Sequence, residues 1–202
     1  MNRRLSAVAV GAGLLLSARA DAHLVTTGLG PVYDGIGHLL LTPEDLVPIL
    51  ALALYAGLRG ARAGRLALFV LPVAWFSGGL FGLSHGVAVT APVPALSFIL
   101  LGLLVAADLK LPDSTVAVFA AALGLVHGFL NGPALAGTGP GARGLAGIAA
   151  VAFVLVALAS ALVVSLKPPA ARIAVRIAGS WIAAVGLLLL GWALRTGAPV
   201  RP

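Results

Sequence analysis

Ionisable side chains interrupt an apolar stretch near the start of this 202-residue chain. In YDGIGHLLLTPEDLVPILALALYAGLRG, residues 33–60, Asp34, His38, Glu44 and Asp45 lie within or beside the apolar run. A carboxylate at the centre of a bilayer costs roughly 2.5 kcal/mol or more on insertion scales. Ionisable residues inside a membrane span indicate a functional site by default, so this stretch is predicted to contain part of the functional site.

Two further histidines lie in later apolar runs. His85 occurs in FGLSHGV, and His127 occurs in LGLVHGFLNGP, where Asn131 follows one helical turn later and shares its face. Both histidines flank glycines spaced four residues apart, and such small-residue stripes let membrane helices approach closely. One stripe, beside His85, consists of Gly78, Gly82 and Gly86, and the other, beside His127, consists of Gly124 and Gly128. Close approach at these glycines would bring the flanking imidazoles together.

The geometry of the first run depends on where its helix begins. At about 100° per residue, a continuous helix would place Asp34, His38 and Asp45 on one face and Glu44 about a quarter-turn away. However, the sequence TPED is also typical of a helix start, with a threonine N-cap, a proline in the first turn and acidic residues near the positive end of the helix dipole. In that alternative, residues 34–41 form a separate short or re-entrant piece, and the two acids act as caps.

Imidazole and carboxylate groups without sulfur suit a borderline divalent ion such as Ni²⁺, Co²⁺, Zn²⁺ or Cu²⁺. The chain has no cysteine, which excludes thiolate metal sites and a cysteine nucleophile. We expect two of the imidazoles, those of His38 and His127, to lie on facing helices, close enough to share one ion. The predicted metal ligands, in order of expected importance, are His38, His127 and Asp45, then His85, Glu44 and Asn131, and finally His23 as an outer capture ligand.

Composition indicates an all-α, polytopic membrane bundle that must position these groups. The chain is 60% hydrophobic and only 9% charged, whereas soluble domains carry about 25% charged residues. Each of six apolar blocks is near the ~20 residues that a helix needs to cross the ~30 Å hydrocarbon core. The links are short, which excludes a soluble catalytic domain. The blocks are residues 36–58, 66–88, 92–109, 114–137, 144–166 and 173–194.

The first 22 residues are typical of a cleavable signal peptide. A basic NRR segment precedes the apolar run LSAVAVGAGLLLS, and ADA before His23 fits a small-x-small cleavage site. Cleavage would leave a single six-helix domain, residues 23–202, with His23 at its N-terminus. The alternative is an uncleaved N-terminal anchor.

The net charge of +7 does not form a basic patch, so we predict no nucleic-acid partner. Basic residues are more frequent in the connections between apolar blocks 1 and 2, 3 and 4, and 5 and 6 than on the other side. The positive-inside rule places these connections in the cytoplasm. The protein is then expected in the bacterial inner membrane with both mature termini in the periplasm and the histidines in the outer half. The expected cytoplasmic residues are Arg59, Arg62, Arg65, Lys110, Lys167, Arg172 and Arg176, against Arg143, Arg195 and Arg201 outside.

Two other kinds of residue are expected to be structural. Asp108 stands beside Lys110 at a cytoplasmic helix end, where a carboxylate needs no functional explanation. The tryptophans Trp75, Trp181 and Trp192 are expected to face lipid or the membrane interface.

The segments GIGHLLLTPEDLVPILALAL and ALGLVHGFLNGPAL resemble two motifs of the HupE/UreJ membrane proteins. This resemblance implies a nickel or cobalt permease associated with hydrogenase or urease maturation, with a cleaved signal and about six spans. The first motif histidine falls on His38 and the later one on His127. The aspartate–histidine pair of the family falls on Glu44 and Asp45, so a carboxylate replaces the second histidine and favours harder, oxygen-rich coordination.

The predicted function is binding and transport of a divalent transition-metal ion that enters from the periplasmic side. Nickel is the first candidate and cobalt the second. No catalytic residue and no organic cofactor is predicted. The first alternative is an intramembrane metal-dependent hydrolase, in which Glu44 would act as general base beside a metal-activated water. The second alternative is a non-transporting accessory subunit. The partners considered are the metal ion, membrane lipid, a second copy of the chain and metalloenzyme maturation proteins.

Overall fold

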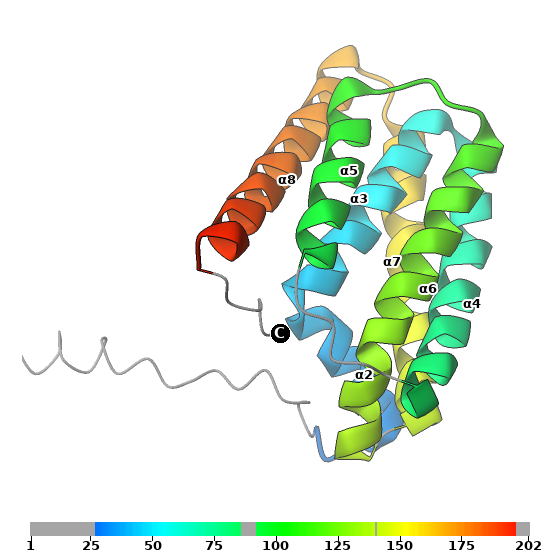
Figure 1. The fold of residues 1–202 in the computed structure, drawn as a ribbon. Coiled ribbons are helices and arrows are strands. Elements are labelled where there is room, and N and C mark those ends of the chain that lie inside the picture. The colour runs from blue at the N-terminus through cyan, green and yellow to red at the C-terminus, as the bar shows by residue number, and fades with distance from the viewer. Residues whose placement is uncertain (1–26, 86–91, 140, 197–202) are drawn as a thin grey trace, which may run out of the picture.

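The computed structural model describes residues 27–85, 92–139 and 141–196. Within them every regular element is an α-helix, as the composition predicted (Figure 1). The predicted signal peptide and His23 lie outside the described residues. The helices are α2 (Pro31–Leu41), α3 (Pro43–Arg59), α4 (Ala61–His85), α5 (Val93–Ala107), α6 (Asp113–Thr138), α7 (Gly141–Ser165) and α8 (Pro169–Thr196).

The first apolar block is broken at Thr42 into α2 and α3, which are bent by 77°. Proline disfavours the α conformation of the residue before it, and Thr42 is accordingly extended, with φ −106° and ψ 92°. The Thr42 hydroxyl donates to the carbonyl of His38 at 2.7 Å and makes no side-chain cap on α3. The expectation of a helix that begins at Pro43 is therefore confirmed, and the continuous helix is not formed.

Among the described residues, four helices are long and apolar enough to cross a membrane, namely α4, α6, α7 and α8. The bent pair α2–α3 makes a fifth crossing if it is counted as one span. The apolar helix α5 has 15 residues, or about 22 Å at 1.5 Å per residue, which is less than the ~30 Å core. It ends where Asp108 adopts the left-handed conformation with φ 51°. The predicted count of six spans therefore stays a prediction.

Helix α3 lies at the centre of the bundle and contacts the six other described helices (Figure 1). Its middle is buried on nearly all sides, with Ala51, Leu52, Ala53, Tyr55 and Ala56 all fully inaccessible. Because α3 carries Asp45 at its start, this central position puts the carboxylate within reach of several neighbours.

The predicted glycine stripes join α4 to α6 through Gly78, Gly82, Gly124 and Gly128, whereas Gly86 lies outside the described residues. A Cβ atom on Gly78 would lie 2.3 Å from the carbonyl oxygen of Leu125, and one on Gly128 would lie 2.1 Å from that of Trp75. Real Cβ contacts are essentially never this short, so only glycine allows the two backbones to approach so closely. This interface fixes the height of α6, and therefore of His127, against the rest of the bundle.

Helix α8 lies at the edge of the bundle and packs mainly on α5 (Figure 1). Small residues form this contact as well: a Cβ on Gly102 would lie 2.5 Å from the amide nitrogen of Ala183. Much of α8 is otherwise exposed, including Trp181 and Trp192. The outward position of these two tryptophans fits the expectation that they face lipid or the membrane interface.

Charged side chains tie α3, α5 and α8 together at one end of the bundle, the upper end in Figure 1. Arg59 forms an ion pair with the carboxylate of Asp108 and donates to its carbonyl at 3.3 Å. Arg172 reaches the same carboxylate at 3.9 Å and donates to the carbonyl of Leu58 at 3.1 Å. The structural role expected for Asp108 is thus supported, and the predicted cytoplasmic connections gather at this end.

Candidate functional site

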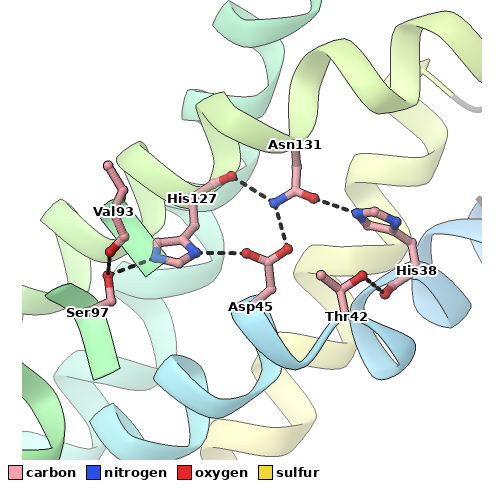
Figure 2. Close-up of polar contacts among 7 residues, drawn as sticks. All are labelled: His38, Thr42, Asp45, Val93, Ser97, His127 and Asn131. Atoms are coloured by element: carbon pink, nitrogen blue, oxygen red, sulfur yellow. Dashed lines mark hydrogen bonds and ion pairs between the residues drawn. The ribbon is translucent and has the colours of Figure 1, made fainter. Parts of the chain in front are cut away.

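Polar side chains from four helices form one hydrogen-bonded chain inside the bundle (Figure 2). Four of them are almost inaccessible, with exposed fractions from 1% for His127 to 8% for His38. Such burial of polar groups is tolerated only where each has a partner. From one end to the other, the members of this polar chain are Ser97 of α5, His127 of α6, Asp45 of α3, Asn131 of α6 and His38 of α2.

Both nitrogens of the His127 imidazole are engaged. Nδ1 lies 2.7 Å from Oδ1 of Asp45, and Nε2 lies 2.9 Å from Oγ of Ser97. A carboxylate oxygen only accepts, so Nδ1 carries the proton that it donates to Asp45. In the neutral ring, Nε2 is then the nitrogen with the free lone pair, and it accepts from the Ser97 hydroxyl.

Asn131 links the two halves of the polar chain through its amide. Its Nδ2 donates to Oδ2 of Asp45 at 2.8 Å and to the carbonyl of His127 at 2.8 Å. Because both amide hydrogens are used, Oδ1 faces Nε2 of His38 as an acceptor. His38 therefore donates from Nε2, and its Nδ1 has the lone pair in the neutral ring.

Asp45 is the negative centre of the polar chain. Its two oxygens accept from His127 and Asn131, and it lies in the first turn of α3, where the helix dipole favours an anion. These contacts offset the cost of burying the carboxylate. The break at Thr42 is what places Asp45 at a helix start.

The two imidazoles belong to one polar chain but do not share one position. Asp45 and Asn131 lie between them. Nε2 of His127 faces Ser97, and Nδ1 of His38 points in the opposite direction, away from Asn131 (Figure 2). In the part of the protein that the structure describes, no three His, Asp or Glu side chains are placed to hold one ion. The expectation that His38 and His127 converge on a single ion is not met in this conformation.

Three other acidic or basic residues singled out in the sequence lie away from the polar chain. Glu44 is partly exposed and makes no hydrogen bond or ion pair with the described residues. His85 is exposed; its Nδ1 lies 3.3 Å from the carbonyl of Phe81, and its ring stacks on that phenyl ring. Asp34 accepts instead from the backbone and hydroxyl of Thr27, at 2.6 and 2.7 Å.

Sequence reasoning did not single out Ser97 and was wrong about Trp75. Ser97 is the one hydroxyl in the apolar block 92–109, which was the only signal available. Trp75 was expected to face lipid but is fully buried, with its indole packed on the His127 ring at 5.6 Å between centroids. The close approach of α6 at Gly128 encloses this tryptophan.

Comparisons with known proteins give one family. The family model described as HupE / UreJ protein matches residues 10–189. Protein HupE of Rhizobium leguminosarum bv. viciae is 27% identical over 187 residues, which cover 89% of this chain and 94% of that protein. No solved structure matches the chain.

Proposed function

Because the chain belongs to the HupE/UreJ family, we propose that this multi-pass membrane protein carries a divalent transition-metal ion, Ni²⁺ or Co²⁺ first, across the bacterial inner membrane from the periplasmic side. The observation that carries the proposal is the buried polar chain from Ser97 to His38, which lies between apolar helices. Imidazole nitrogen is a suitable ligand for these ions.

The polar chain orients each imidazole for binding. A carboxylate that accepts from one nitrogen of a histidine fixes its tautomer and the orientation of the ring. Asp45 does this for His127 and presents Nε2, and Asn131 orients His38 and presents Nδ1. Asp45 thus acts by holding the His127 ring, rather than as one of the direct ligands first expected.

Two separate imidazole positions suit transport. An ion that crosses a membrane must be held well enough to enter and weakly enough to leave, which favours several partial sites over one closed cage. His38 and His127 provide such a pair on α2 and α6. We propose that the ion passes from one imidazole to the other, and that His23 is an outer capture ligand.

The hydrolase alternative has less support. A catalytic zinc-type site needs three protein ligands around an open position, and no such trio is present among the described residues. Glu44, the expected general base, lies outside the polar chain. These observations favour passage of an ion over hydrolysis.

Metal accumulation in cells tests the proposal. Cells that make the protein should accumulate more of one divalent metal, measured by elemental analysis, and His127→Ala should abolish the gain while the protein still reaches the membrane. His85→Ala should keep the gain, because His85 lies outside the polar chain. Unchanged levels of every first-row metal, together with one ion bound per purified chain, would favour the hydrolase.

A further inference from the structure

Ser97 occupies the nitrogen through which His127 would bind an ion. Asp45 engages Nδ1 at 2.7 Å, which leaves Nε2 for a ligand, and Nε2 lies 2.9 Å from the Ser97 hydroxyl oxygen. A metal–imidazole bond is about 2.0–2.1 Å long and lies along the same lone pair. An ion on Nε2 would therefore lie far inside the contact distance of this hydroxyl.

Resting on the proposed function, we propose that Ser97 is a gating residue for His127. Its hydroxyl covers Nε2 when no ion is present and turns away when an ion enters. The residue is not a ligand in this proposal; it competes with the ion for one nitrogen.

The structure shows a second acceptor beside the Ser97 hydroxyl. Oγ of Ser97 also lies 3.1 Å from the carbonyl oxygen of Val93, one turn earlier on α5. A hydroxyl has a single hydrogen, so it donates either to Nε2 of His127 or to this carbonyl. When an ion takes Nε2, Oγ has to rotate away about the Cα–Cβ bond of Ser97, and the Val93 carbonyl is the second acceptor to which its hydrogen can turn.

The place of Ser97 in the fold also suits a gate. It lies near the start of α5, which packs on α8 and α3 and is tied at its far end through Asp108. The bond from Ser97 to His127 joins the start of α5 to α6. When this bond is released, the start of α5 is no longer held to the imidazole, while the other end of α5 stays tied through Asp108.

Binding of Co²⁺ and Ni²⁺ to the purified full-length protein tests the gate. In a Trp181→Phe/Trp192→Phe background Trp75 is the remaining tryptophan, and its ring lies 5.6 Å from that of His127. These paramagnetic ions should quench its fluorescence, Zn²⁺ should not, and equilibrium dialysis gives the affinity independently. Ser97→Ala removes the competing hydrogen bond and should tighten binding about five-fold.

Two variants serve as controls. Ser77→Ala removes a hydroxyl with the same bond to the carbonyl one turn earlier, at 2.8 Å, but on the exposed face of α4, and should leave the affinity unchanged. Ser97→Thr keeps the hydroxyl and should restore the wild-type value. Unchanged or weaker binding in a folded Ser97→Ala variant would overturn the gate and leave the transport proposal standing. A wild-type protein that binds neither ion would overturn both.

Discussion

At the scale of single residues, the structure explains how a carboxylate is kept in an apolar bundle. Asp45 has two N–H donors on α6 and lies at the start of α3. The neighbouring Glu44 also lies in the first turn of α3, but it has no such donors and is partly exposed. Adjacent acids in one sequence motif therefore have different roles, which makes them a matched pair for mutation.

Asp45→Asn should weaken Co²⁺ or Ni²⁺ binding about 10- to 100-fold, the usual effect of losing a group that orients a metal-binding histidine. The physical reason is that an amide has one acceptor oxygen, whereas Asp45 accepts from both His127 and Asn131. Glu44→Gln, measured in the same equilibrium dialysis, should leave the affinity unchanged. Equal losses in the two variants would show that charge, and not the orientation of His127, matters.

The residues of the polar chain could be predicted only in part from the sequence. The shared face of His127 and Asn131 follows from helical spacing alone, and the structure confirms it. Ser97 could not be recognised, because a serine in a helix commonly bonds the carbonyl one turn earlier and needs no other partner. The glycines beside His85 suggested that its imidazole would face another helix. The sequence does not show in which direction a side chain at the end of a helix points, and His85 is exposed. The role of these residues as metal ligands stays a prediction.

At the scale of helices, two local sequence features shape the site. The Thr42–Pro43 pair breaks the first block and turns one long helix into α2 and α3. The glycines of α4 and α6 bring these helices into backbone contact. Both features were visible in the sequence, because proline and evenly spaced glycines act through the backbone. The burial of Trp75 was not visible in the sequence, because it depends on which helix covers the face of α4 that carries this residue.

Gly128→Ala should destabilise the protein by about 1–3 kcal/mol, the usual range for overpacking, or more. A methyl group there would lie 2.1 Å from the carbonyl oxygen of Trp75, so α4 and α6 would have to separate. Gly137→Ala, on the same helix with nothing within 4 Å, is the control and should be neutral or stabilising by up to about 1 kcal/mol. Thermal unfolding in detergent measures both, and a stable Gly128→Ala variant would contradict the tight interface.

At the scale of the whole molecule, charge is distributed unevenly between the two ends of the bundle. Arg59 and Arg172 meet Asp108 at one end, and Arg62 pairs with Asp113 at 3.5 Å nearby. The sequence predicted this gathering because the basic residues lie in alternate connections. It could not predict the length of α5, because Asp108 ends this helix through a left-handed turn that also depends on its ion pairs.

Cysteine labelling tests the orientation, because the protein has no cysteine of its own. Arg62, whose side chain is 82% exposed, lies at the end predicted to be cytoplasmic, so Arg62→Cys should react only with a reagent that crosses the membrane. Arg143→Cys, exposed at the opposite end, should react with an impermeant reagent added outside intact spheroplasts. The reverse pattern would invert the proposed direction of ion entry.

The long sequence separation within the polar chain has a consequence for synthesis of the protein. Asp45 and His127 are 82 residues apart, and His38 and Asn131 are 93 apart. At 5–20 residues per second, a ribosome needs on the order of 4 to 16 s to make the 82 residues between Asp45 and its imidazole partner. During that interval the carboxylate has no donor from α6, and hydrocarbon offers none. The nascent α3 therefore has to stay beside water or the insertion machinery until α6 arrives, and only then can lipid close around the first span.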